Sequence, residues 1–482
     1  DDVRLAAREG YRSVEHMKRY TTLGMATDQG KTGGVAGLAL LADALGQSIP
    51  ETGITTFRPP YTPVPIAVLA GRRRRAHWTP ERLTPMHERH VALGARFTDA
   101  GVWRRAWYYP QSRGGGAIEG VGSAYVREAR QVRERCGIVD VSTLGKIDVQ
   151  GPDAAEFLNR VYVNGFAKLP VMKARYGVML RDDGIVLDDG VSWRLAEDRF
   201  LMTCTTAQAG KVMRWLEYLL AIRWPELRVH VASVTDQWGG VAVAGPRARA
   251  AIERVLARGD VSHAGLPFMG VTEGAVAVEG GLVPVLIGRV SFSGELAFEL
   301  HAPAHWAAAM WDALLGAVRA EGGVPYGLEA LGTLRIEKGH VTGAELDGRV
   351  TLEDAGLGRM ASTKKPFIGS ALRQRPGLQA EGRPALVHVV PVEAGVVFSG
   401  GAILQDPRIP GGGNDGHGVG WITGVTESPA LGGWLGIGFV EGGAAAWQGR
   451  EVVVAEPVEG RSCRARIESA HRFDPSGERM HA

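Results

Sequence analysis

Two carboxylates in this sequence stand among apolar and aromatic neighbours, where an unpaired charge is costly. Asp189 lies in the run Tyr176–Trp193, and Glu299 is flanked by Phe298 and Leu300. Burial disfavours the charged form of a carboxylate, so it raises the pKa and suits the group to accept a proton or to face a cationic intermediate. These two acids are therefore the first candidates for chemistry.

The dipeptide Asp183-Gly184 predicts a hairpin in the first of these runs. Asp-Gly between two strand-like runs is a strong signal for a two-residue turn. The register that follows pairs Asp182 with Ile185 and Tyr176 with Val191.

Strand parity then decides which way Asp189 points. Side chains alternate between the two faces of a strand, so the residues predicted to share one face are Tyr176, Asp189, Val191 and Trp193. The opposite face would carry Asp188, Gly190 and Ser192. The alternative for Asp189 is that it accepts a backbone N–H in a turn and has only a local role.

Glu299 belongs to a second segment with a turn and a strand. Gly294 allows the turn, and residues 297–300 continue as a strand. The simplest alternative to a functional role is a salt bridge from Glu299 to Arg289.

A third cluster lies within one helical turn, where Arg335, Glu337 and Lys338 follow each other closely. This pattern favours a charged helix end over a site. His340 has no second histidine at ligand spacing, so no metal site is predicted.

The common cofactor motifs are absent. Gly33–Gly37 does not form the G-x-G-x-x-G pattern of dinucleotide-binding folds, and the sequence contains no Walker A loop and no Gly-x-Ser-x-Gly elbow. Gly411–Gly418 is typical of a loop between strands. The basic run Arg72–Arg75 is either a solvated loop or a site for phosphate or an acidic partner.

Composition excludes several classes of protein. The chain has 482 residues, a net charge of +3 and three cysteines. A charge this small does not indicate nucleic-acid binding, and three scattered cysteines are too few for a fold held together by disulfides. No apolar stretch is long enough for a membrane span, and the N-terminus, which begins at Asp1, lacks the regions of a signal peptide. We expect a cytoplasmic, reducing location.

Residue composition and apolar spacing divide the chain into four regions, which together predict an α+β fold. Residues 1–46 have helical apolar spacing, and residues 47–109 are proline-rich, which favours an extended linker. Residues 110–367 alternate short strands with helices. Residues 368–482 contain glycine-punctuated strands typical of a small β-barrel-like domain.

From about His87 to the end, the order of several motifs resembles the aminomethyltransferase (T-protein) family of the glycine cleavage system. The matching stretches are Cys136–Ser142, Tyr176–Asp189, Val241–Pro246, Ser293–Glu299, Leu334–Gly339 and Gly418–Gly438. This resemblance implies two folate-binding α/β parts in residues 110–367, followed by the small barrel.

The whole chain also resembles the C-terminal half of the α subunits of heterotetrameric sarcosine oxidases. The segments specific to that family are Lys18–Thr32, Thr55–Pro63 and Arg335–His340. The large subunits of N-methylglutamate dehydrogenases are similar, and the sequence leaves the choice between the two open. That family has a dinucleotide-binding domain before the matching half. We expect that domain to be a separate chain or missing here, and we predict no NAD binding by this chain.

The resemblance implies a tetrahydrofolate site with named residues. Asp189 matches the essential aspartate of the family, and Glu299 matches the glutamate that binds the pterin. Further positions that match folate-binding residues are Tyr176, Trp193, Phe292 and Arg335.

The implied reaction begins on a partner. A flavin subunit oxidises an N-methyl amine such as sarcosine, and the one-carbon unit passes to this chain. There a folate nitrogen attacks it, giving 5,10-methylene-tetrahydrofolate and the demethylated amine, while Asp189 positions that nitrogen and helps take up its proton. The alternatives are a stand-alone folate-dependent aminomethyltransferase or demethylase, and a non-catalytic scaffold for the flavin subunits.

The N-terminal segment is implied to lie near FMN, at an interface with a flavin-containing β-type subunit of a hetero-oligomer that also has smaller subunits. The residues with donors suited to a phosphate are Lys18, Arg19, Thr21, Thr22, Gln29 and Lys31. Residues 1–135 contain no cysteine, so we expect no iron–sulfur cluster in this segment.

Overall fold

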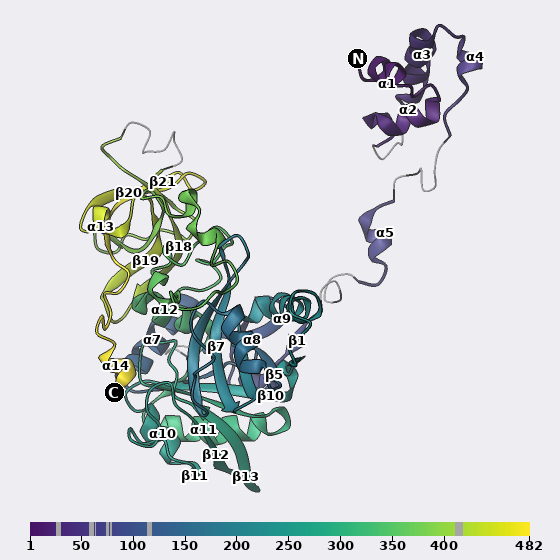
Figure 1. The fold of residues 1–482 in the computed structure, drawn as a ribbon. Helices are drawn as coiled ribbons and strands as arrows, with labels where there is room; N and C mark the ends of the chain where they lie inside the picture. Colours follow the sequence, from purple (N-terminus) through teal and green to yellow (C-terminus); the bar gives the residue numbers. More distant parts are fainter. Residues whose placement is uncertain are drawn as a thin grey trace. The chain divides into compact units, whose positions relative to one another are not determined.

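A computed structural model describes residues 1–25, 30–56, 62, 64–73, 77, 80–112, 118–409 and 418–482. The chain forms two compact units, Asp1–Pro80 and Glu81–Ala482, shown in Figure 1. The two units are considered one at a time. The candidate folate residues all belong to the second.

The N-terminal unit is helical, as the apolar spacing of its first 46 residues predicts. Its helices are α1 (Asp2–Arg8), α2 (Val14–Tyr20), the 3₁₀ turn η1 (Thr22–Gly24), α3 (Gly34–Leu45), α4 (Ile49–Thr52) and α5 (Ile66–Ala70). A small core of Ala6, Val14, Met17, Leu38 and Leu41 holds the first three helices together.

Residues 82–108 are not an extended linker, and this part of the predicted linker 47–109 is wrong. They form β1 (Arg82–Leu83), α6 (His87–Ala92), β2 (Arg96–Ala100) and β3 (Trp103–Tyr108), with a three-stranded sheet in the order β1-β3-β2. The physical reason is burial: His90, Trp103 and Tyr109 pack inside the second unit. Most prolines of residues 47–109 precede residue 80, so the proline content indicated an extended linker only for the first part of this region.

The second unit contains a seven-stranded sheet in the order β11-β12-β13-β14-β10-β4-β15. Its strands are β4 (Gly137–Asp140), β10 (Trp238–Ala244), β11 (Leu256–Arg258), β12 (Val271–Val278), β13 (Gly281–Gly288), β14 (Ala297–Pro303) and β15 (Val324–Pro325). Helices α10 (Ala248–Glu253) and α11 (Ala307–Ala320) pack against the sheet (Figure 1). Trp311 and Phe298 are buried in this core.

A five-stranded sheet in the order β6-β7-β8-β5-β9 is its neighbour. Its strands are β5 (Gly145–Gln150), β6 (Lys173–Leu180), β7 (Val186–Ala196), β8 (Arg199–Cys204) and β9 (His230–Ser233). Ile147 and Met202, which pair directly, point to one face and pack with α8 (Ala154–Val161) and α9 (Ala209–Tyr218). The opposite face carries the candidate residues described below.

The β6–β7 hairpin has the predicted register over most of its length, since Tyr176 pairs with Val191. Near the turn the prediction is wrong, because a bulge lets Leu180 pair with Val186 and leaves Asp182 in a wider loop. The cause is local: the Asp183 carboxylate accepts the N–H of Ile185 at 3.1 Å, which competes with ladder bonding at the turn.

The C-terminal part is a closed barrel in the order β16-β19-β18-β17-β20-β21. Its strands are β16 (Ala385–Pro391), β17 (Ile403–Gln405), β18 (Gly420–Ser428), β19 (Gly433–Val440), β20 (Glu451–Glu456) and β21 (Arg461–Ser469). The remaining helices of this unit are α7 (Val121–Glu134), α12 (Leu328–Lys338), α13 (Ala444–Trp447) and α14 (Glu478–His481). Helix α12 packs against both α7 and β18, which ties the barrel to the sheets. The α+β class with a terminal β-barrel is confirmed.

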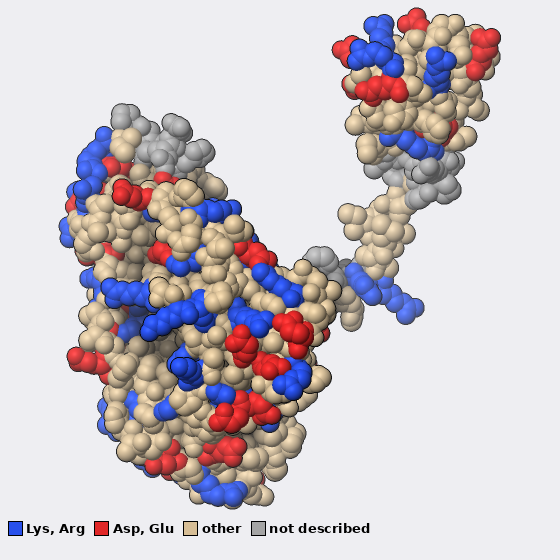
Figure 2. Space-filling view, viewed as in Figure 1, with Lys and Arg blue, Asp and Glu red and all other residues tan. Residues whose placement is uncertain are grey.

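Two further observations concern helix length and surface charge. Within the described ranges no helix is long and apolar enough to cross a membrane. On the face of the second unit shown in Figure 2, basic and acidic side chains are interspersed.

Candidate functional site

One face of the five-stranded sheet brings four predicted residues together. Trp193 pairs with Leu201 in β8, so the face that carries Trp193 also carries Thr203, two residues farther along, and Lys146, which pairs with Thr203. Asp189 and Tyr176 lie on this same face, where their side chains meet. The shared face predicted for Tyr176, Asp189, Val191 and Trp193 is therefore observed.

Asp189 lies within strand β7, so the turn in the alternative for this residue is wrong. The Tyr176 hydroxyl donates a hydrogen bond to Asp189 Oδ2 at 2.8 Å. Burial and the neighbouring Asp188 carboxylate raise the pKa of Asp189 to about 7, although the Tyr176 hydrogen bond opposes that rise. Asp188 points to the other face and accepts the N–H of Thr205 at 3.1 Å.

Trp193 connects the two sheets. Its side chain is completely buried, and it packs against Gly288 so closely that a Cβ at that position would lie 2.5 Å from the ring. Gly288 pairs directly with Glu299, and the Trp193 ring centre lies 5.0 Å from that of His301. The face that carries Asp189 thus meets the face that carries Glu299 at this indole.

Glu299 has a different partner from the one its sequence context suggests. Its Oε2 atom lies 3.5 Å from Nε2 of His301, two residues farther along β14, and its side chain is 15% exposed. Arg289 instead donates to the carbonyls of Leu266 and His481. The salt-bridge alternative is therefore wrong. Burial lowers the pKa of His301, although the neighbouring Glu299 carboxylate opposes that fall.

Lys146 is a charged residue of this region that the sequence did not single out. It is completely buried, and its ammonium donates to the carbonyls of Ser142 at 3.0 Å and Leu144 at 3.2 Å. Burial lowers the pKa of Lys146 to about 8, and the nearby Glu299 and Asp140 carboxylates limit that fall. A single lysine within a predicted strand is a weak signal, and no spacing rule marks it.

Polar atoms without partners surround the meeting point of the sheets. The Trp193 indole N–H and His301 Nδ1 are buried and have no hydrogen-bond partner among the described residues. Unpaired buried polar atoms are costly, so they indicate a polar ligand or ordered water between the sheets. Such a ligand would meet a proton acceptor at Asp189 and an acceptor of N–H groups at Glu299.

The structure does not bring Arg335 and Phe292 into contact with these residues. The Arg335 guanidinium binds Glu345 at 2.8 Å, and both side chains are buried. The Phe292 ring is 38% exposed and lies 6.0 Å from the His340 ring. Their assignment to folate therefore still rests on the sequence resemblance.

The charged end of α12 is an interior network and not a solvated helix end. Arg133 binds Glu295 at 2.8 Å and Glu337 at 2.7 Å, and the side chains of all three are at most 6% exposed. Lys338 binds Asp474 at 3.0 Å. These contacts hold α7, α12 and the C-terminal segment together.

The phosphate-donor candidates of the N-terminal unit have partners inside that unit. Lys18 donates to the carbonyl of Thr56, Arg19 binds Glu15, and the Thr21 hydroxyl donates to the carbonyl of Met17. Of the remaining candidates, Thr22 begins η1 and is exposed, Lys31 is exposed, and Gln29 lies outside the described residues. The first three side chains are therefore a poor fit for direct contact with an FMN phosphate.

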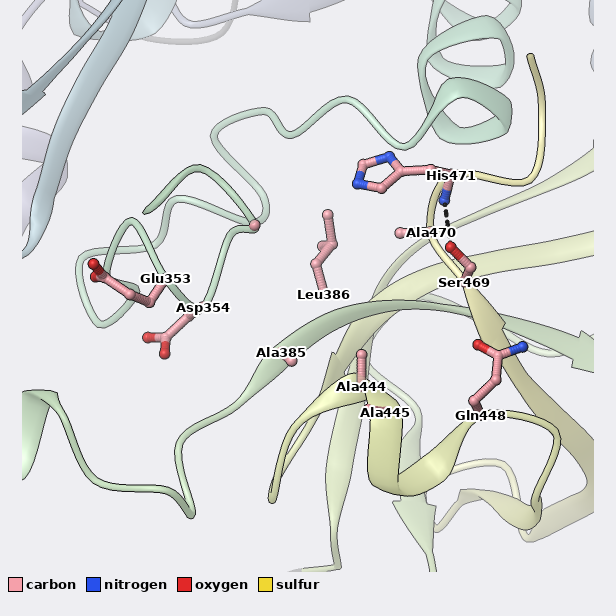
Figure 3. A pocket seen from close by; sticks show the side chains of 11 residues that line it. Glu353, Asp354, Ala385, Leu386, Ala444, Ala445, Gln448, Ser469, Ala470 and His471 are labelled. Atoms are coloured by element: carbon pink, nitrogen blue, oxygen red, sulfur yellow. Dashed lines mark hydrogen bonds between the residues drawn. The ribbon is translucent and has the colours of Figure 1, made fainter. Parts of the chain in front are cut away.

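A separate open cavity of about 580 Å³ lies beside the barrel. Small side chains of β16, α13 and the end of β21 line it, together with Glu353 and Asp354 (Figure 3). Asp354 is ion-paired with Arg383, and none of the predicted site residues lines this cavity. Over the described ranges no group of three potential ligands is arranged for a metal ion.

Two family models match this chain. The GCVT N-terminal domain covers residues 86–365, and the sarcosine oxidase A3 domain covers residues 1–72. The first spans both sheets and every candidate folate residue. The second spans the N-terminal helical unit almost completely.

Whole-chain comparisons agree with these models. Sarcosine oxidase subunit alpha of Rhizobium meliloti is 46% identical over all of this chain and 48% of its own length, so this chain spans about half of such subunits. An aminomethyltransferase of Streptomyces coelicolor is 32% identical over 76% of this chain and 91% of its own length. The crystal structure of the glycine cleavage aminomethyltransferase T of Bartonella henselae matches with a TM-score of 0.67 and 25% identity, and it covers 81% of this chain and 99% of that one.

Proposed function

We propose, from the premise that this chain belongs to the aminomethyltransferase family, that it transfers a one-carbon unit to tetrahydrofolate within an assembly that oxidatively demethylates an N-methyl amine such as sarcosine. The observation that carries this proposal is the placement of two carboxylates, Asp189 and Glu299, on sheet faces that come together at the buried Trp193 ring. The product is 5,10-methylene-tetrahydrofolate.

Glu299 recognises the pteridine end of the folate. A pteridine presents a 2-amino group and an adjacent ring N–H, and one carboxylate can accept both hydrogen bonds. The ring of His301 lies beside Glu299 and the Trp193 ring lies beside His301, and buried nitrogens of both rings lack polar partners, which a pteridine has. This environment fits the proposed substrate.

The folate nitrogen is the nucleophile that attacks the one-carbon unit. Asp189 accepts the proton that this nitrogen loses. A pKa of about 7 lets Asp189 accept a proton at neutral pH and later release it, which is the range that favours general base catalysis. The Tyr176 hydroxyl fixes the orientation of the Asp189 carboxylate.

The direct test is the Glu299→Gln substitution with tetrahydrofolate as the titrant. We expect the variant to bind tetrahydrofolate about tenfold to a hundredfold more weakly, because hydrogen bonds to a charged acceptor contribute about 1.5–3 kcal/mol. Quenching of tryptophan fluorescence measures the affinity, since Trp193 lies at the site. Equal affinity of the variant and the wild-type protein would refute the assigned role.

Replacement of Tyr176 by Phe tests the pKa of Asp189. The Tyr176 hydrogen bond favours the ionised carboxylate, so its loss raises the pKa of Asp189 above about 7. The one-carbon transfer rate rises as Asp189 ionises, and we expect the rising limb of its pH profile to move to higher pH. An unchanged limb would exclude Asp189 as the titrating group.

The rest of the assembly is proposed from the resemblance to sarcosine oxidase alpha subunits. It comprises a flavin-containing β-type subunit with FMN at its interface with this chain, smaller subunits, and a dinucleotide-binding part in another chain or beyond this sequence.

The large subunit of an N-methylglutamate dehydrogenase is the second candidate, favoured by the same similarity. Intact mass of the co-purified assembly, and turnover of sarcosine against N-methylglutamate, distinguish them. We place the assembly in the cytoplasm, where three unpaired cysteines would persist.

A further inference from the structure

His301 stands next to Glu299 on the same face of β14, and its side chain is completely buried. Two glycines of the neighbouring strands make room for side chains on this face. Gly240 in β10 pairs with His301, and Gly288 in β13 pairs with Glu299. A Cβ at Gly240 would lie 2.8 Å from His301 Nδ1, so the imidazole covers the backbone of that glycine.

Trp193 holds the imidazole from the other sheet. The indole covers Gly288, and its ring centre lies 5.0 Å from that of His301, with an angle of 62° between the two ring planes. Buried side chains are packed at crystal-like density and occupy defined rotamers. The packing between an indole and a glycine backbone therefore fixes the directions of the two imidazole nitrogens.

One of these nitrogens faces the carboxylate. His301 Nε2 lies 3.5 Å from Glu299 Oε2, which is the outer limit of a hydrogen bond. A carboxylate accepts hydrogen bonds and cannot donate them, so an unprotonated nitrogen at this place would repel it. The stable tautomer of His301 therefore carries its proton on Nε2. This contact orients the carboxylate through Oε2 and leaves Oε1 to accept from a ligand.

We propose that His301 is a positioning residue for pteridine recognition: its Nε2–H, directed by the packing of the imidazole between Trp193 and Gly240, turns the Glu299 carboxylate toward the 2-amino group and the adjacent N–H of the pteridine. The inference rests on the proposed function and deepens it, because it makes a histidine–glutamate pair the recognition element. His301 acts through Glu299, so its loss weakens binding and leaves the proton acceptor Asp189 in place.

Two amide substitutions of His301 test where the N–H must lie. Glutamine places an amide N–H close to the position of Nε2, whereas asparagine places it close to Nδ1, away from Glu299. In the full chain within its assembly, His301→Gln is expected to bind tetrahydrofolate within about threefold of the wild-type affinity, because it keeps the hydrogen bond. His301→Asn is expected to bind about tenfold more weakly, because it loses a hydrogen bond to a charged acceptor. Calorimetric titration measures the affinities, and equal values for the two variants would overturn the inference.

Gly240→Ala tests the packing without a change at His301. The added Cβ would stand 2.8 Å from Nδ1, so the imidazole must turn away from its position. We expect tetrahydrofolate binding to weaken about tenfold, as in His301→Asn, and this variant replaces His301→Asn if the latter does not fold. Unchanged affinity would contradict the role of packing in directing Nε2.

A change in the ligand shows whether the effect passes through the Glu299 carboxylate. The 2-desamino-2-methyl analogue of tetrahydrofolate lacks the amino group that this carboxylate is proposed to bind. His301→Asn is expected to weaken binding of the analogue by less than about threefold, because one of the two hydrogen bonds that His301 supports is already missing. Equal losses for the analogue and for tetrahydrofolate would show that His301 does not act through Glu299.

His388→Asn is the matched control for the loss of a buried imidazole. His388 is also completely buried, but its Nε2 contacts the carbonyl oxygen of Ile336 at 2.7 Å. This control should lower the melting temperature without weakening tetrahydrofolate binding, and a loss of affinity equal to that of His301→Asn would overturn the inference.

The outcomes distinguish the two proposals. If the wild-type chain in its assembly does not bind tetrahydrofolate, the proposed function fails. If it binds, and His301→Asn binds equally well, only the role of His301 fails. A loss in His301→Asn that His301→Gln restores, and that His388→Asn does not share, supports it.

Discussion

Replacement of Asp189 by Asn is expected to slow one-carbon transfer to tetrahydrofolate by about 100-fold to 10,000-fold, the usual contribution of a positioned proton acceptor. Asparagine keeps the size of the side chain and an oxygen that can accept the Tyr176 hydrogen bond, but it cannot take up a proton. Binding of tetrahydrofolate should change by much less than the rate. Single-turnover formation of methylene-tetrahydrofolate measures the rate, and fluorescence quenching measures the affinity.

The same substitution should stabilise the protein at high pH. The pKa of Asp189 is raised in the folded state, so its ionisation destabilises the fold as pH rises from about 4 through about 7. The gain in melting temperature of Asp189→Asn should therefore be larger at pH 8 than at pH 4. Asp182→Asn is the control, since Asp182 is 55% exposed and pairs with Arg223. If Asp189→Asn forms methylene-tetrahydrofolate at the wild-type rate, that result would support the alternative that this chain is a non-catalytic scaffold for the flavin subunits.

Replacement of Arg133 by Met should lower the free energy of unfolding by about 3–5 kcal/mol, the typical effect of removing one partner from a buried ion pair. Glu337 is completely buried and would lose its only cationic partner among the described contacts, while Glu295 would keep Arg479 at 2.9 Å. Arg133 also stacks on Phe473 at 3.8 Å. Urea unfolding followed by circular dichroism measures the loss.

Two exposed ion pairs that share Arg160 provide the comparison for this prediction. Arg160 binds Glu156 and Glu226, but all three side chains are at least 31% exposed. Arg160→Met should therefore lower the free energy of unfolding by no more than about 1 kcal/mol. Similar losses for the two variants would mean that the Arg133 network does not carry the stability assigned to it.

Much of the candidate site could be predicted from local patterns. The two-residue period of a strand places Asp189 on the face of Trp193, and the Asp-Gly turn aligns Tyr176 with Val191; both features are observed. The wider loop was not predictable from the turn motif, because the side chain of Asp183 competes for backbone donors. The fold of residues 82–108 was missed because these residues are ordered by burial against elements that lie far away in the sequence, which no local pattern reveals.

The alternation of side chains along each strand and the order of the motifs were determined by the sequence alone, since both depend on near neighbours in the chain. What faces Glu299 was decided only by the tertiary structure. His301 lies 3.5 Å from its carboxylate, Trp193 of the other sheet packs against Gly288, which pairs with Glu299, and Arg289 donates to other carbonyls. The tertiary packing decides which groups surround the Glu299 carboxylate. The free energy of a buried charge depends on every group within a few ångströms, wherever those groups lie in the chain.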